Sequence, residues 1–232
     1  MGTNFPRKAS LRRTCRVPSC TRPAASSFAA FCAPHRTAVR RHGAPDQKAV
    51  TKARLAPYIR LVKARIARNA DNVAWVTLDD RWRALVDHAQ RILATFATGK
   101  PGIRFERIAA QEIVKLAADA EPRAVVEVTA AMVIMQEFEP RVFRSDDAFW
   151  LQLARRVRSL TDLHFGESWD NQRQRVRRHY REVSPKAAII MGRWLAETLG
   201  IGGTHIARVE LAEQSQKANE REGLHDALRK LV

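Results

Sequence analysis

The sequence has almost no acidic residues near its beginning. Among residues 1–68 the only acid is Asp46, against sixteen lysines and arginines, so this segment carries +15 of the chain's net charge of +17. The remaining residues are nearly neutral. A basic segment in front of a neutral body is typical of proteins that contact a polyanion at one end, which indicates nucleic acid as a partner.

The chain also lacks long apolar segments. It contains no run of about 18 apolar residues, so it predicts no transmembrane helix. The opening residues, MGTNFPRKASLRRT, are charged and contain no apolar stretch, which excludes a secretory signal there. We therefore expect a cytoplasmic, nucleoid-associated protein with no membrane partner.

The signatures of several large enzyme classes are missing as well. There is no P-loop, glycine-rich dinucleotide turn, G-x-S-x-G or H-E-x-x-H. His164, Asn171 and His179, with Asp162 upstream, follow the order of an HNH nuclease. That site needs a β-hairpin, however, and we expect this region to be helical. We assign no catalytic residue and predict that the protein is not an enzyme.

Cysteine is scarce, and all three cysteines lie in one short stretch. Cys15, Cys20, Cys32 and His35 follow the spacing C-x4-C-x11-C-x2-H. Three thiolates and one imidazole form a closed tetrahedral set for one structural Zn²⁺, with no open position for a substrate. Because this segment is too short to bury a hydrophobic core of its own, metal binding would supply the free energy that folds it. A disulfide framework fits poorly because the number is odd, and three unrelated buried cysteines are the other alternative.

The residues after His35 extend this pattern. Arg40, Arg41, His42, Gly43 and Pro45 lie in R-R-H-G-A-P, and the whole motif resembles a small zinc-binding module of phage and mobile-element proteins. That module is found in front of some phage HNH endonucleases and in uncharacterised phage DNA-binding proteins. Arg36 departs from it, because an aromatic residue often follows the histidine. The resemblance covers residues 15–45 only and implies zinc and nucleic-acid contact.

The basic side chains of this region are the predicted nucleic-acid contacts. Asp46 to Asn69 has the pattern of a basic amphipathic helix broken at Pro57. A solvated helix face is the alternative interpretation. The predicted contacts, with DNA favoured over RNA, are Arg12, Arg13, Arg16, Arg22, Arg36, Arg40, Arg41, His42, Lys48, Lys52, Arg54, Arg60 and Lys63.

The rest of the chain shows helical periodicity and no convincing strand. We expect helices from Thr77 to Gly99, from about Phe105 to Ala118, from Pro122 to before Pro140, from Ser145 to Leu160, from about Trp169 to Val183, from Ser184 to Leu199, and from Thr204 onward. The Pro122 helix is apolar nearly all round, which makes it the expected centre of the core. The predicted fold class is all-α, a helical bundle body with a small N-terminal structural zinc module. Its expected divisions are a basic flexible tail (1–14), the zinc module (15–45), the helical body (46–203) and a long polar C-terminal helix (204–232).

Two further segments are ambiguous. Arg173, Arg175, Arg177, Arg178, His179 and Arg181 lie on the expected helix 169–183 and form either a solvated face or a second phosphate contact. The stretch around Gly200 matches the offsets of a helix-turn-helix, with a recognition helix starting near Thr204. Two bundle helices joined by a glycine turn are the alternative. The residues concerned are Ala196, Gly200, Thr204, His205 and Arg208.

These observations predict a non-enzymatic, zinc-containing nucleic-acid-binding protein of phage or mobile-element type, with DNA favoured as its partner. A second hypothesis is an adaptor or structural subunit of a larger nucleoprotein complex, in which the C-terminal helix binds other protein subunits. A third is a degenerate HNH-like nuclease. RNA stays open as an alternative to DNA because no base-stacking platform is evident.

Overall fold

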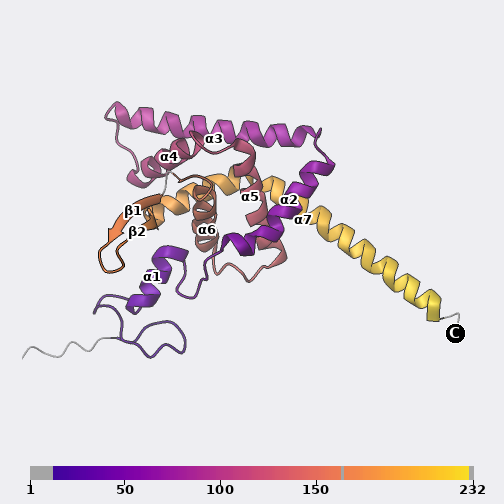
Figure 1. Ribbon diagram of the computed structural model, residues 1–232, viewed down its shortest axis with the longest axis horizontal. Helices are drawn as coiled ribbons and strands as arrows, with labels where there is room; N and C mark the ends of the chain where they lie inside the picture. Colours follow the sequence, from indigo (N-terminus) through magenta and orange to yellow (C-terminus); the bar gives the residue numbers. More distant parts are fainter. Residues whose placement is uncertain (1–12, 163–164, 230–232) are drawn as a thin grey trace, which may run out of the picture.

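Figure 1 shows the computed structural model, which describes residues 13–162 and 165–229. Most of the described chain is helical, and its only named strands form one antiparallel hairpin, so the predicted helical class is confirmed. The elements in order are α1 (Ala33–His42), α2 (Lys52–Arg68), α3 (Val73–Ala97), α4 (Arg104–Ala117), α5 (Pro122–Phe138), α6 (Asp146–Arg158), β1 (Phe165–Asp170), β2 (Arg175–Tyr180) and α7 (Pro185–Arg229).

Helix α5 is the centre of the body, as its composition predicts. Pro122 occupies its first turn, where a missing backbone N–H costs nothing. Most of its side chains from Val125 to Met135 are buried, because α2, α3, α6 and α7 all pack against it. Helix α4 closes the bundle against α3 and α7. The core cluster begins at Val50 and includes no residue of the cysteine-containing segment.

Two helices differ from their expected limits. Helix α3 begins at Val73, capped by Asn72, and not at Thr77, because Trp75 and Leu78 continue the buried stripe of the helix one turn earlier. Helix α2 begins at Lys52 and runs through Pro57 without a break. Burial of its apolar face outweighs the one backbone hydrogen bond that the proline removes.

The predicted helix-turn-helix is wrong. Residues 185–229 form one continuous helix that contains Ala196, Gly200 and Thr204. The glycines serve close packing here: a Cβ on Gly203 would lie 2.8 Å from the carbonyl oxygen of Ala130 on α5. Contact with α5 therefore compensates for the weak helix propensity of glycine. The expected division between residues 203 and 204 lies inside this helix.

The expected helix over 169–183 is also wrong, because β1 and β2 form an antiparallel hairpin there. Trp169 pairs with Val176, and Asp170 pairs with Arg175. Asp170 Oδ1 accepts hydrogen bonds from the backbone N–H groups of Gln172 and Arg173, which closes the loop. Aspartate and asparagine in such a turn, flanked by aromatic and β-branched residues, are the local signal for a hairpin.

The distal part of α7 extends away from the bundle (Figure 1). Every side chain from Gln214 to Asp226 is exposed. A search of the described helices finds none with the length and hydropathy needed to cross a lipid bilayer.

Candidate metal centre and the surface around it

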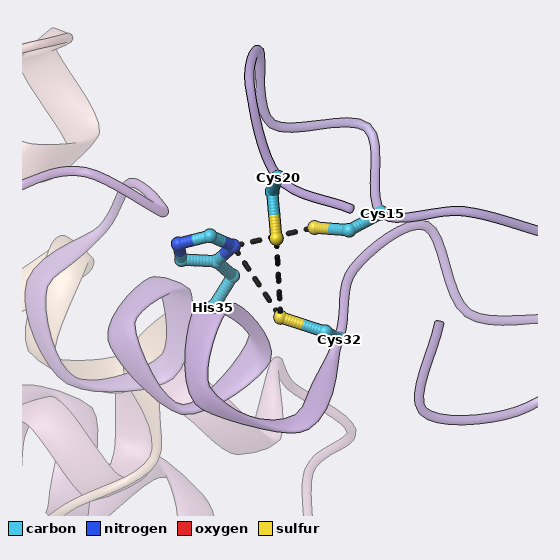
Figure 2. A group of neighbouring side chains, drawn as sticks. All are labelled: Cys15, Cys20, Cys32 and His35. Carbon is cyan, nitrogen blue, oxygen red and sulfur yellow. Dashed lines mark hydrogen bonds between the residues drawn. The ribbon is translucent and has the colours of Figure 1, made fainter. Parts of the chain in front are cut away.

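The four predicted ligands meet at one point (Figure 2). His35 Nδ1 lies 3.2 Å from Cys15 Sγ and 3.4 Å from Cys32 Sγ, and the sulfur atoms of Cys20 and Cys32 are 4.0 Å apart. A tetrahedral site with Zn–S bonds of 2.3 Å and Zn–N bonds of 2.0–2.1 Å has S···S edges of about 3.8 Å and S···N edges of about 3.6 Å. The three observed separations lie within about 0.4 Å of those edges, and all four ligand atoms lie within 4.8 Å of one another, so these residues are positioned to hold one metal ion.

Local backbone structure places each ligand. Cys15 follows Thr14, which forms an isolated bridge with Pro23, and the Cys15 N–H donates to the carbonyl of Arg22. Ser19 has a φ of +64°, and this tight turn brings Cys20 back toward Cys15. Cys32 is the N-cap of α1, and His35 lies in the first turn of that helix. A turn and a helix start therefore supply two ligands each.

The surroundings of Cys20 favour its ionised sulfur, whereas at Cys32 a backbone hydrogen bond from His35 is outweighed by burial and by the sulfurs of Cys15 and Cys20, which raise its pKa. The Cys20 thiolate accepts a hydrogen bond from the backbone N–H of Arg22, and this holds the pKa of Cys20 below its usual value. The side chain of Arg22 also lies beside this sulfur, which raises the pKa of the guanidinium. A deprotonated thiol is the form that binds a metal. In the described part of the chain, no other group of three or more His, Cys, Asp or Glu residues is arranged to hold an ion.

The R-R-H-G-A-P segment joins this module to the helical body. Gly43 ends α1 with a φ of +91°, and a Cβ there would lie 2.5 Å from Ala148 Cα. His42 Nδ1 lies 3.1 Å from Nε2 of Gln152, and Arg155 donates to the carbonyl of Arg41 over 3.0 Å. The segment that was predicted to contact nucleic acid therefore forms much of the intramolecular joint.

A single carboxylate strengthens this joint. Glu182, which follows β2, lies 3.1 Å from Nε of Arg41, 3.6 Å from Arg155 and 3.9 Å from Arg40. Arg158 also donates to the backbone carbonyl of Arg181. The base of the hairpin is thus tied both to α1 and to α6.

The predicted nucleic-acid contacts divide into two groups. Arg54 is bound to Glu139 at 2.6 Å and Lys63 lies 3.7 Å from Glu127, so these side chains, like Arg40 and Arg41, serve ion pairs within the molecule. Arg12 lies outside the described residues. His42 belongs to the joint described above, and the side chain of Arg22 is exposed and lies beside the Cys20 sulfur. The other exposed side chains without an ion pair in the described ranges are Arg13, Arg16, Arg36, Lys48, Lys52 and Arg60.

The residues of the helix-turn-helix prediction all lie on the single helix α7, and they do not form a separate recognition helix. Thr204 donates back to the carbonyl of Gly200 at 3.4 Å, and Ala196 packs against the core. His205 lines a groove of about 650 Å³ between α2, α3 and α7, whose walls include Trp75 and Ile206. Arg208 is exposed.

The nuclease hypothesis stays a prediction. The reason given against it, a helical region, is wrong because Asn171 lies in the loop of the hairpin. His164 lies outside the described residues, and of His179 only the backbone in β2 is described.

Sequence reasoning missed two exposed aromatic side chains. Phe28 lies in the loop between Cys20 and Cys32, and Trp169 lies on β1. The Trp169–Val176 pair can be predicted only if the hairpin is predicted first. The sequence signal for that hairpin is the turn at Asp170 and Asn171.

Comparison with known proteins finds no family model, no curated protein and no solved structure that matches this chain. The resemblance of residues 15–45 to the phage module therefore stays a prediction.

Proposed function

We propose that this chain is a non-enzymatic nucleic-acid-binding protein, with DNA as its partner, whose N-terminal module is held by one structural Zn²⁺. The observation that carries the proposal is the Cys15–Cys20–Cys32–His35 cluster at the head of the basic segment. Three sulfurs and one imidazole favour zinc over harder cations such as Mg²⁺ or Ca²⁺. Four protein ligands leave no position for a reacting water, which supports a structural role.

The distribution of unpaired charge supports nucleic acid as the partner. Arg13, just before the module, and Arg16 and Arg36 within it are exposed and have no ion pair in the described structure, and no residue of the module is acidic. Such side chains attract phosphate groups and release condensed counterions on binding. Because the joint fixes the module to the body, the basic surface is presented in one orientation and not on a free tether.

Salt dependence of binding tests the proposal. We expect anisotropy titrations of a fluorescent duplex to give log Kobs that falls linearly with log salt, with a slope of about −0.9 per phosphate contacted. Removing two contacts in Arg16→Ala/Arg36→Ala should reduce the magnitude of that slope by about 1.8. Arg91→Ala/Arg104→Ala removes the same charge from exposed positions on α3 and α4 and should leave the slope unchanged. No binding of either duplex or single-stranded DNA at low salt would overturn the proposal, and equal losses in both variants would overturn the assigned surface.

One observation favours a second function, that of a subunit in a nucleoprotein complex. The exposed distal part of α7 has no packing partner of its own in the described structure (Figure 1). An isolated helix of this length is marginal in water, so a protein partner would gain an ordered docking element. Chromatography coupled to light scattering, with and without DNA, separates the two functions: a DNA-binding protein forms its complex with DNA alone.

A further inference from the structure

The β1–β2 hairpin carries a second group of unpaired arginines. Arg173, Arg175 and Arg177 are exposed, and none has an ion pair among the described residues. Arg175 and Arg177 lie on the same face because alternate residues of a strand point to the same side. The nearest acid in the register, Asp170, uses its Oδ1 to close the loop. The hairpin therefore presents positive charge although the body as a whole is nearly neutral.

The opposite face of the hairpin presents an exposed aromatic ring. Trp169 and Val176 are directly paired across the strands, and they are 56% and 57% exposed. Leaving a tryptophan this open forgoes the burial that its large apolar surface would provide. The hairpin therefore carries an open indole on one face and unpaired arginines on the other, which suits a partner that offers both planar rings and negative charge.

The metal-binding module repeats this combination. Phe28, at the tip of the loop between Cys20 and Cys32, is 99% exposed. Among the exposed large hydrophobic residues of the described chain, Phe28 and Trp169 are the aromatic ones. Both lie on elements with unpaired arginines, and the neutral bundle has no counterpart.

The two elements are fixed to each other at their bases. Glu182 lies two residues after the end of β2 and pairs with Arg40 and Arg41 of α1. The hairpin and the module accordingly lie on the same side of the bundle in Figure 1, away from α3. One extended ligand can therefore contact both elements.

We propose that the hairpin and the module loop together bind single-stranded nucleic acid, with Trp169 and Phe28 stacking on bases and the arginines contacting phosphates. The inference rests on the proposed nucleic-acid function and names the form of the ligand. Exposed rings beside positive charge suit single strands because every base offers a stacking face. In a duplex those faces are covered by neighbouring bases, and the rings gain nothing without unstacking them.

Competing titrations with single-stranded and double-stranded probes test this. We expect Trp169→Ala and Phe28→Ala each to weaken binding of a labelled oligothymidine of about 20 nucleotides by roughly tenfold, and to leave a duplex of equal length within about twofold. Leu224→Ala, which removes a 62% exposed apolar side chain from α7, should change neither affinity. Trp169→Phe should retain most of the affinity, because the ring remains.

Intrinsic fluorescence supplies an independent readout. Stacking of a base on Trp169 quenches its emission, so wild-type fluorescence should fall on addition of oligothymidine and the fall should be lost in Trp169→Phe. Unchanged single-strand affinity in both alanine variants, or an equal loss for duplex, would overturn the inference while the nucleic-acid function stands. Absence of binding to both probes would overturn the proposed function itself.

Discussion

His42 Nδ1 lies 3.1 Å from Nε2 of Gln152, across the joint between α1 and α6. Gln152 is almost fully buried, and its Oε1 already accepts the backbone N–H of Val50 at 3.0 Å. The amide nitrogen is therefore the atom that faces His42, and it needs an acceptor there. A neutral imidazole supplies that acceptor, whereas a protonated imidazole does not.

This relationship predicts a pH-dependent stability. Burial, with Arg155 and Arg41 nearby, lowers the pKa of His42, and Glu182 opposes the shift only in part. Because the unfolded chain binds this proton more tightly, the contribution of His42 to stability is complete above the unfolded pKa of about 6.5. It is lost as pH falls from that value through the lower folded pKa. Denaturant unfolding of wild type and His42→Gln at several pH values should show the dependence in wild type and a flatter profile in the variant. The exposed His205→Gln should behave as wild type, and parallel profiles for His42→Gln and wild type would contradict the assignment.

Gly43 predicts a second effect at the same joint. Alanine there must adopt a φ of +91° and bring its Cβ within 2.5 Å of Ala148 Cα. Gly99 is the matched control, since its φ is +76° and nothing lies within 4 Å of an added Cβ. We expect Gly99→Ala to cost about 1 kcal/mol of unfolding free energy from backbone strain alone. Gly43→Ala should cost a further 1–3 kcal/mol or so from overpacking. Equal costs would show that the module does not pack on α6.

Metal removal should unfold the module and leave the bundle intact. The core cluster contains no module residue, whereas within the module the buried hydrophobic residues are Cys15, Ala24 and Cys32. We expect one zinc per chain in wild type and none in Cys32→Ser by metal analysis. The variant should become sensitive to proteolysis within the module while retaining nearly all of its helical circular dichroism. Ser27→Ala, an exposed change in the same loop, should keep its zinc. Global unfolding of Cys32→Ser would contradict the independence of the two parts.

The features that could be predicted from the sequence are those that local spacing determines. A turn and a helix start bring the ligands together. Their spacing in the sequence therefore predicts that they lie close to one another, and these residues are Cys15, Cys20, Cys32 and His35. Helix α5 is likewise recognisable because apolar residues all round a helix require burial on every side. Ser145 was recognisable as a cap, and it accepts the backbone N–H of Ala148.

The features that could not be predicted depend on contacts between distant residues. Glycines at 200, 202 and 203 favour a helix end locally, and only the approach of Ala130 on α5 explains why the helix continues. The sequence predicts that Arg40 and Arg41 are free to contact phosphates. In the structure both pair with Glu182, which is far away in the sequence. The number of unpaired basic side chains therefore depends on the fold. For α1 and α2, the net charge counted along the sequence overstates that number, because acids elsewhere in the chain pair with these side chains.

Because the end of α7 is exposed, we expect its truncation to leave the free energy of unfolding nearly unchanged. Side chains 214–226 are exposed, so deleting residues 218–232 removes no packing described here and should change the free energy of unfolding by less than about 0.5 kcal/mol. Deletion from residue 210 onward is the informative comparison. It also removes Glu210 and Glu213, which hold the largely buried guanidinium of Arg65 at 2.5 and 2.7 Å. Leaving the Arg65 guanidinium without its two carboxylate partners should lower the free energy of unfolding by roughly 3 kcal/mol. Denaturant melts of both truncations, run at two protein concentrations, check this: a large and concentration-dependent loss on deleting 218–232 would mean that the distal helix binds a second copy of the chain.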